Sequence, residues 1–214
     1  MLRQQDVLVT RPSQVYSCRH PGQRTDDVCL TVSFYTEAME ADGAQMDVVY
    51  SSGRRMTFPA TNRLRYLHRS LLALLASKDT AAGAENLAIS LWQALADAPP
   101  RRLYRDAQLG WYAERVEAAR KIIEARFADK LTLSDLARSV GMSPFHFCRI
   151  FTELAGMPPH RCLLEVRLRA AAAMLRAGAD SVTDACFRSG FRDLSHFIRL
   201  FQRRFGATPS RYAG

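Results

Sequence analysis

The second half of this 214-residue chain contains an internal repeat, in which residues 132–159 recur as residues 181–209. Both copies contain a glycine, then an apolar pattern that includes an arginine, and then a second glycine followed by proline. A supersecondary unit that occurs twice in succession indicates two similar folded units in tandem. The repeat therefore restricts the fold of this half more than any other feature.

Each copy has the signals of two short helices joined by a tight turn. It opens with a capping box, S/T-x-x-D, which satisfies free amides at a helix start. About two turns later comes a glycine suited to the left-handed conformation that ends a helix. A new cap follows, with Pro144 in the first turn of the first copy. This order predicts two helix-turn-helix units. The paired residues are Thr132, Asp135, Gly141 and Ser143 in the first copy and Ser181, Asp184, Gly190 and Asp193 in the second.

The second helix of each copy has an apolar face and a mixed face. The apolar residues recur at i, i+3, i+4 and i+7 and are expected in the core. They are Phe147, Ile150, Phe151 and Leu154, and Phe197, Leu200, Phe201 and Phe205. The residues expected to face outward are Phe145, Cys148, Arg149 and Thr152, and Leu194, Ser195, Ile198, Arg199 and Gln202. An exposed Phe or Leu beside an arginine is unusual in solvent. In a DNA major groove, apolar groups meet thymine methyls and arginine meets guanine.

The positive charge of the chain is concentrated in the same half. Residues 1–100 contain ten Lys+Arg and ten Asp+Glu, whereas residues 101–214 contain twenty and eleven, which accounts for the whole net charge of +9. Most of these basic residues are arginines, which suit bidentate contacts with phosphate and guanine. A confined basic excess is typical of a protein with a polyanionic partner. A solvated basic face would give the same charge, so charge alone leaves both interpretations open.

The first hundred residues change from a strand pattern to a helical one. Short runs rich in Val, Tyr, Phe and Thr predict strands at 6–10, 15–19 and 28–35. From Thr61 the spacing of leucines predicts a helix, and a second helix is expected over 84–96. The leucines of the first helix are Leu64, Leu67, Leu71, Leu72 and Leu75. They suit a homodimer contact and burial within a monomer equally well.

A domain boundary is expected at Pro99-Pro100, and beyond it the pattern is helical throughout. One amphipathic helix is expected over 111–127, and a long helix over 159–177 joins the two copies of the repeat. This connector carries four arginines, Arg161, Arg167, Arg169 and Arg176. A rigid connector would fix the distance between two DNA-reading helices, and two major-groove segments on one face of DNA lie ~34 Å apart.

Over residues 110–213 the sequence resembles the DNA-binding domain of the AraC/XylS family of bacterial transcription regulators. The motifs RIF, GMPP, RLRAA, GFRDLSHF and FGATPSRY all fall at the family's spacing. The resemblance implies a sequence-specific regulator, not an enzyme, that inserts two recognition helices into successive major grooves of double-stranded DNA at promoters. By position it implies base contacts from Phe145, His146, Cys148 and Arg149, and from Leu194, Ser195, Ile198 and Arg199. Phosphates or helix ends are the expected partners of Ser143, Arg192 and Arg203.

The first half resembles the same family more loosely. The stretch DVLVTRPSQVYSCRHP resembles later strands of the family's cupin-type effector domain, and the helices after it resemble its linker, which in the family also mediates dimerisation. The opening strands of such a barrel are missing, so the chain is a fragment, or its start codon is placed late, or the sensor is degenerate. We favour an incomplete N-terminus. The resemblance further implies RNA polymerase and a small-molecule effector as partners.

The expected fold class is α+β and mostly α. Residues 1–60 are expected to form a partial cupin-like β segment, a remnant of a cupin-type barrel. Residues 61–100 are expected to form a helical linker that is a candidate dimerisation region. Residues 101–214 are expected to form an all-α domain of seven helices with two helix-turn-helix units.

Other functions have little support in the sequence. No run approaches ~18 apolar residues, and the N-terminus does not resemble a signal peptide, so we expect a cytoplasmic protein associated with the nucleoid. The motifs of common hydrolases, nucleotide-binding loops and zinc proteases are absent, and we expect no cofactor. Cys18, His20 and Cys29 are candidates for a metal or thiol-sensing site. Without a CxxC pair this site has weak support, and ordinary thiols are the favoured interpretation.

Overall fold

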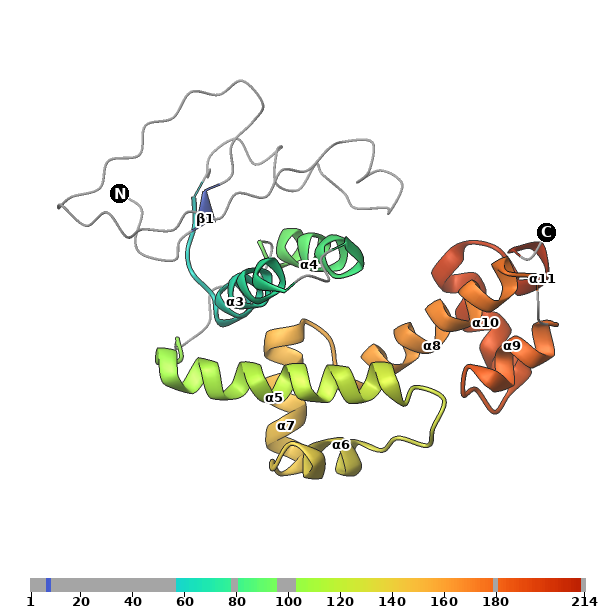
Figure 1. The fold of residues 1–214 in the computed structure, drawn as a ribbon. Coiled ribbons are helices and arrows are strands. Elements are labelled where there is room, and N and C mark those ends of the chain that lie inside the picture. Colours follow the sequence, from blue (N-terminus) through green and yellow to red (C-terminus); the bar gives the residue numbers. More distant parts are fainter. Residues whose placement is uncertain (1–6, 9–56, 78–80, 96–102, 179–180, 213–214) are drawn as a thin grey trace, which may run out of the picture. The chain divides into compact units, whose positions relative to one another are not determined.

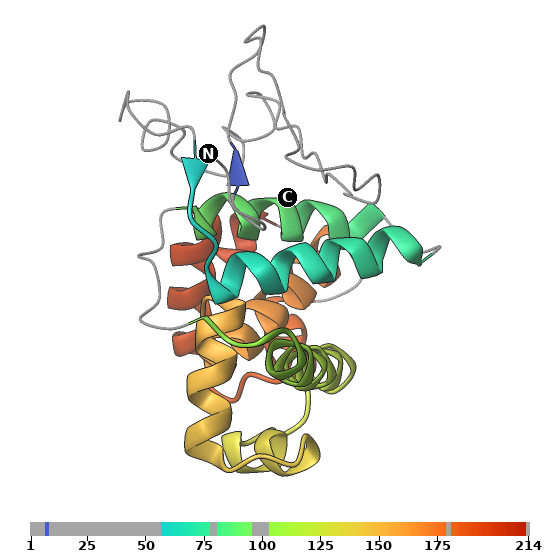
Figure 2. The same ribbon diagram turned by 90° about the vertical axis from the view of Figure 1, so that its left-hand side faces the viewer.

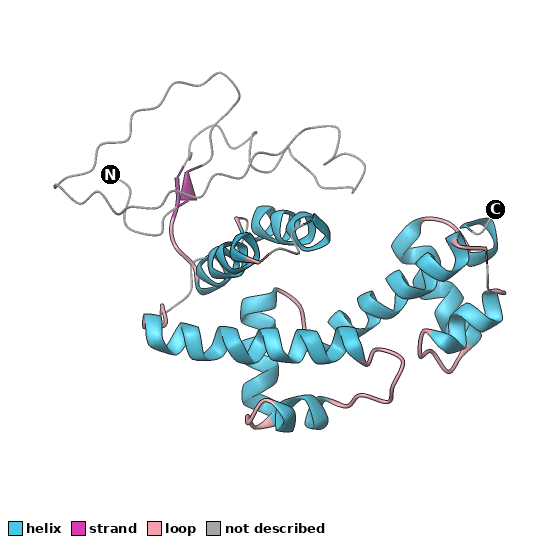
Figure 3. Cartoon of the chain, viewed as in Figure 1, coloured by secondary structure: helices cyan, strands magenta, loops and turns pink. Residues whose placement is uncertain are grey.

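The computed structural model describes residues 7–8, 57–77, 81–95, 103–178 and 181–212. Within these residues helices account for nearly all of the regular structure, and two short strands make up the rest (Figure 3). The chain divides into two compact units, residues 1–105 and residues 106–214. The mostly helical fold expected from the sequence is therefore confirmed for the described residues.

In the first unit, a strand pair precedes two helices. Strand β1 (Val7–Leu8) pairs antiparallel with β2 (Thr57–Phe58). Helix α3 (Asn62–Ala76) begins after Thr61, whose hydroxyl accepts a hydrogen bond from the Leu64 amide at 3.0 Å. Helix α4 (Ala81–Ala94) packs against α3. The strands predicted over 15–19 and 28–35 lie outside the described residues, so the cupin-type remnant stays a prediction.

The second unit is all helical in its described residues (Figure 1). Its helices are α5 (Asp106–Ala125), α6 (Leu133–Ser139), α7 (Pro144–Ala155), α8 (Pro159–Arg176), α9 (Val182–Arg188), α10 (Leu194–Phe205) and α11 (Pro209–Tyr212). α5 packs against α6 and α7, whereas α9 and α10 pack against each other. α8 contacts helices of both groups and lies between them in the ribbon.

Buried aromatic residues anchor each second helix of the repeat. α7 packs against α5, which is seen end-on beside it in Figure 2. The four predicted core residues of α7, Phe147, Ile150, Phe151 and Leu154, are all fully buried. On α10, Phe197 and Phe201 are fully buried in a cluster that includes residues of α8 and α9. Leu200 and Phe205 pack against that cluster but are only partly buried. The apolar face predicted for each helix is therefore the one that meets the core.

The helix starts and turns follow the expected signals, with two differences. At α9 the Asp184 amide donates to Ser181 Oγ at 3.1 Å, but the reciprocal capping box predicted for both copies forms only at α6. Thr132 and Asp135 form a reciprocal capping box at α6, with the Asp135 amide donating to Thr132 Oγ1 at 3.1 Å. Gly141 and Gly190 both have a positive φ, of 67° and 87°. Asp193 caps α10 by accepting from the His196 amide at 2.8 Å. Ser143 occupies the equivalent place at α7, but its side chain makes no capping hydrogen bond.

Candidate nucleic-acid interface

The outward face of α7 presents an aromatic ring and a guanidinium group to solvent. Phe145 has 82% of its surface exposed, although it lies two residues before the fully buried Phe147. Arg149 is also exposed, whereas Cys148 between these positions is half-buried. An exposed phenyl ring is unfavourable in water, and a partner surface that offers methyl groups would cover it.

Neighbouring side chains on α7 and α5 position Arg149. Its Nη1 lies 3.6 Å from Glu153 Oε2, one helical turn further along α7. Its Nη2 lies 3.4 Å from Nδ1 of His146. The His146 ring in turn lies 5.5 Å from the ring of Tyr112 on α5, which is buried. Glu153 and His146 therefore hold the Arg149 guanidinium against the surface of α7. The His146 ring is half-buried, because one side of it packs near Tyr112.

The outward face of α10 presents Ser195 and Arg199, both exposed. Leu194 and Ile198 are half-buried and pack against the core cluster of the second unit. The expectation that Leu194 is exposed is therefore wrong. Leu194 precedes Phe197 by three residues and Phe201 by seven, so it lies on the same side of the helix as these buried rings. Ile198 follows Phe197 directly and borders that stripe.

The three residues expected at phosphates or helix ends are all on the surface. Ser143 and Arg192 lie in the turns before α7 and α10, and Arg203 lies in the last turn of α10. Partial burial lowers the pKa of Arg167 below its ordinary value, and the positive charge of Arg192 adds to this lowering.

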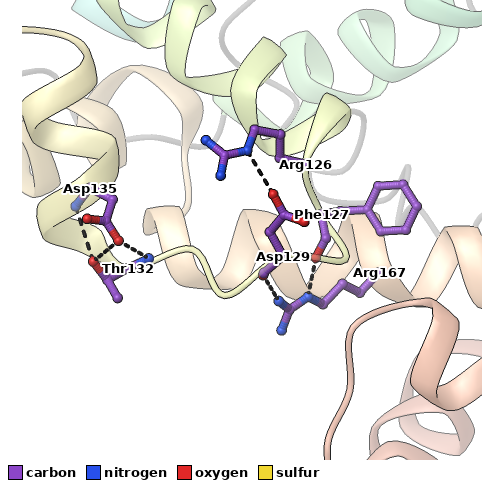
Figure 4. Close-up of polar contacts among 6 residues, drawn as sticks. All are labelled: Arg126, Phe127, Asp129, Thr132, Asp135 and Arg167. Carbon is purple, nitrogen blue, oxygen red and sulfur yellow. Dashed lines mark hydrogen bonds and ion pairs between the residues drawn. The ribbon is translucent and has the colours of Figure 1, made fainter.

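Arg167 on the connector bonds to the protein itself, which the sequence did not reveal. Its Nε donates to the carbonyl oxygen of Phe127 at 2.7 Å, and its Nη2 donates to that of Asp129 at 2.8 Å (Figure 4). Both carbonyls belong to the loop between α5 and α6. The arginines at 161, 169 and 176 are exposed, and the Arg176 guanidinium lies 4.8 Å from the centroid of the Tyr212 ring. The connector arginines are therefore not equivalent, and the linear spacing gave no signal of this.

Among the described residues, His, Cys, Asp and Glu form no group of three or more that could hold a metal ion. Three thiols, those of Cys148, Cys162 and Cys186, are free there. The candidate residues Cys18, His20 and Cys29 lie outside the described residues, so the sensing site stays a prediction. The described helices also include none with the length and apolar character needed to cross a membrane.

Comparison with known proteins identifies the family. A model described as "Helix-turn-helix domain" matches residues 136–214. The transcriptional activator RhaS of Klebsiella pneumoniae is 28% identical over 204 residues, which are 89% of this chain and 71% of RhaS. The regulator YbfI of Bacillus subtilis is 27% identical over 199 residues, which are 89% of this chain and 69% of YbfI. The crystal structure of a probable AraC family transcriptional regulator from Rhodopseudomonas palustris is 30% identical. The matched region is 47% of this chain and 94% of the Rhodopseudomonas palustris chain, and the TM-score is 0.45.

The chain belongs to the AraC/XylS family of transcription regulators. It is accordingly a sequence-specific DNA-binding transcription regulator, and it is not an enzyme. In a helix-turn-helix unit the second helix is the one that enters the major groove, which makes α7 and α10 the candidate recognition helices.

Proposed function

We propose that α7 and α10 enter successive major grooves on one face of duplex DNA, with α8 setting their separation. The observation that carries this proposal is the placement of Arg149 and Arg199. Each is exposed at the same position of its helix, opposite a pair of phenylalanines that are fully buried. A helix whose apolar face is fixed in a core can offer only its other face to a groove.

The length of the connector supports this arrangement. α8 has 18 residues, and a helix of that length spans about 27 Å at ~1.5 Å per residue. Because α8 contacts helices of both groups, its length contributes directly to the distance between the two helix-turn-helix units. Successive major-groove segments on one face of DNA lie ~34 Å apart, which is the same order of distance.

The side chains divide into base readers and phosphate contacts. The proposed base readers are Phe145, His146, Cys148, Arg149, Leu194, Ser195, Ile198 and Arg199. Arginine can read guanine bidentately, and the apolar members can meet thymine methyls. The half-buried members, among them Leu194 and Ile198, present only part of their surface to a base. The proposed phosphate contacts are Ser143, Arg192 and Arg203.

Further partners belong to the same proposal. The relative RhaS is named a transcriptional activator, which favours activation over repression for this chain. The proposal also includes contact with RNA polymerase, control by a small-molecule effector, and action at promoters on the bacterial nucleoid. On α3, Leu64, Leu67 and Leu71 are buried, whereas Leu72 and Leu75 are 37% and 63% exposed. The buried leucines serve the monomer, and the two exposed ones are the surface that a homodimer would use.

The test is the variant Arg149→Ala with the full-length chain. The probe is a duplex selected from a random library by the wild-type chain, together with its single-base variants. We expect Arg149→Ala to lose about 1–3 kcal/mol of binding free energy on the selected duplex and to relax discrimination at one base position. Gel shifts at two salt concentrations measure both effects, and wild-type binding should weaken steeply with salt because bound counterions are released.

The matched control is Arg115→Ala on α5. The Arg115 guanidinium lies 3.4 Å from the centroid of the Trp111 ring, so it is occupied within the protein and lies outside both recognition helices. The control removes the same charge and should leave base preference unchanged. If Arg149→Ala kept both the affinity and the base preference of the wild type, the proposed orientation of α7 would be wrong.

A further inference from the structure

The turn of the second helix-turn-helix unit lies directly on the loop that follows α5. A Cβ atom added at Gly190 would lie 2.9 Å from three backbone atoms, namely Ala128 Cα, Ala128 O and Phe127 O. Backbone atoms cannot move aside as the end of a flexible side chain can. At Gly141, the matching glycine of the first unit, a Cβ would meet nothing within 4 Å. The missing side chain at Gly190 therefore permits a close approach between two backbone segments, whereas no such approach occurs at Gly141.

Arg167 fixes the same loop from the connector. Its guanidinium group donates hydrogen bonds to the carbonyl oxygens of Phe127 and Asp129, at 2.7 and 2.8 Å (Figure 4). The loop is also closed on itself, because the Asp129 amide donates to Arg126 O at 3.0 Å and Arg126 Nε lies 2.8 Å from Asp129 Oδ2. The loop after α5 is therefore held by hydrogen bonds and an ion pair of its own. Arg167 on α8 contacts it from one helix, and the turn at Gly190 contacts it from the second helix-turn-helix unit.

We propose that Arg167 and Gly190 are positioning residues that lock the two helix-turn-helix units in one relative orientation. This inference rests on the proposed function, in which α7 and α10 read two grooves at once. A single shared helix such as α8 can bend and twist. A second point of contact, between the second turn and the loop after α5, removes much of that freedom. The lock makes the protein selective for the spacing of the two DNA segments.

The variant Arg167→Lys tests the lock without changing the net charge. One ammonium group cannot reproduce the fixed fork of two donors that reaches both carbonyls. The matched control is Arg169→Lys, which makes the same chemical change at an exposed position two residues away on α8. Since both variants keep a positive charge, attraction to phosphate is the same in each.

The probes are the duplex selected by the wild-type chain and two derivatives, with one base pair inserted or deleted between its two protected segments. For the wild type, losing a base contact on a derivative should lower affinity about 5- to 150-fold. With Arg167→Lys we expect this ratio to shrink at least severalfold, because a loosened joint accommodates the shifted segment. Arg169→Lys should keep the wild-type ratio. Gly190→Ala should behave like Arg167→Lys, and Gly141→Ala like the wild type.

The ratio between duplexes separates positioning from stability. A variant that is only less folded binds all three duplexes more weakly by one common factor, which leaves the ratio unchanged. An unchanged ratio for both Arg167→Lys and Gly190→Ala would overturn the lock while leaving two-groove binding intact. A wild-type footprint confined to one groove segment is a different result, because it would contradict the proposed function itself and the lock with it.

Discussion

Replacing each turn glycine by alanine measures how tightly the second turn packs on the loop after α5. Gly141 and Gly190 occupy equivalent places in the repeat, and both have a left-handed backbone conformation. An alanine in that conformation costs about 1–2 kcal/mol at either position. At Gly190 the new methyl group would also lie 2.9 Å from three backbone atoms, well inside the ~3.5–4.0 Å at which carbon atoms pack best.

Forcing a methyl group into a packed site costs about 1–3 kcal/mol. We therefore expect Gly141→Ala to lose about 1–2 kcal/mol of unfolding free energy and Gly190→Ala to lose about 2–5 kcal/mol. The difference between the two variants isolates the close approach, because the backbone strain is common to both.

Urea unfolding of the full-length chain, followed by far-ultraviolet circular dichroism, measures both losses against the wild type. The shape of the transition should stay the same, so that midpoints can be compared directly. If the two variants lost the same free energy within about 0.5 kcal/mol, the turn at Gly190 would not pack on the loop, and the geometry of the lock would be wrong.

Two further predictions concern the cores and caps of the helix-turn-helix units. Phe147→Ala should destabilise the chain by about 3–5 kcal/mol because the ring is fully buried. Its neighbour Phe145→Ala should change stability by no more than about 0.5 kcal/mol and weaken DNA binding instead; equal stability losses in thermal unfolding would contradict the assigned faces. The hydrogen bonds that Asp135 accepts from Thr132 lower the pKa of its carboxyl group. The carboxylate therefore stabilises the fold at a pH above the ordinary pKa of aspartate, and this contribution is lost as the pH falls through the lowered pKa of Asp135. Asp135→Asn should therefore be less stable than the wild type at about pH 7, with the gap in urea midpoint closing towards about pH 3; a gap independent of pH would show that the charge is irrelevant.

The helices of the repeat could be predicted because their signals are local. A capping residue and its partner lie three positions apart, and a glycine with positive φ ends the helix within the same short stretch. Thr132 and Asp135 form the box that their spacing predicts. Gly141 has the left-handed conformation expected of it. The period of the phenylalanines then identifies the buried face, as Phe147 and Phe151 confirm.

What the sequence could not give depends on contacts between distant segments. Arg167 reaches a loop about 40 positions earlier in the chain, and nothing in its own neighbourhood distinguishes it from Arg169. The close approach at Gly190 is hidden in the same way, because a glycine in a turn already has a sufficient local reason. Leu194 is a different case. Its position three residues before Phe197 is a local signal that already places Leu194 on the buried side of the helix, so the predicted exposure contradicts the period of the phenylalanines.

The two copies of the repeat are not interchangeable, because the two arginines proposed to read bases, Arg149 and Arg199, have different neighbours. Arg149 has Glu153 one turn further along α7, 3.6 Å away, and this carboxylate holds and partly neutralises it before DNA arrives. Arg199 has Arg203 at the corresponding position of α10, and like charges at that spacing repel on a helix surface. Within the described residues Arg199 forms no ion pair. In the proposed complex, α7 therefore brings a pre-positioned reader, whereas α10 brings two cations whose repulsion is relieved by phosphate. Binding through the second unit thus depends more on the charge of the DNA backbone than binding through the first.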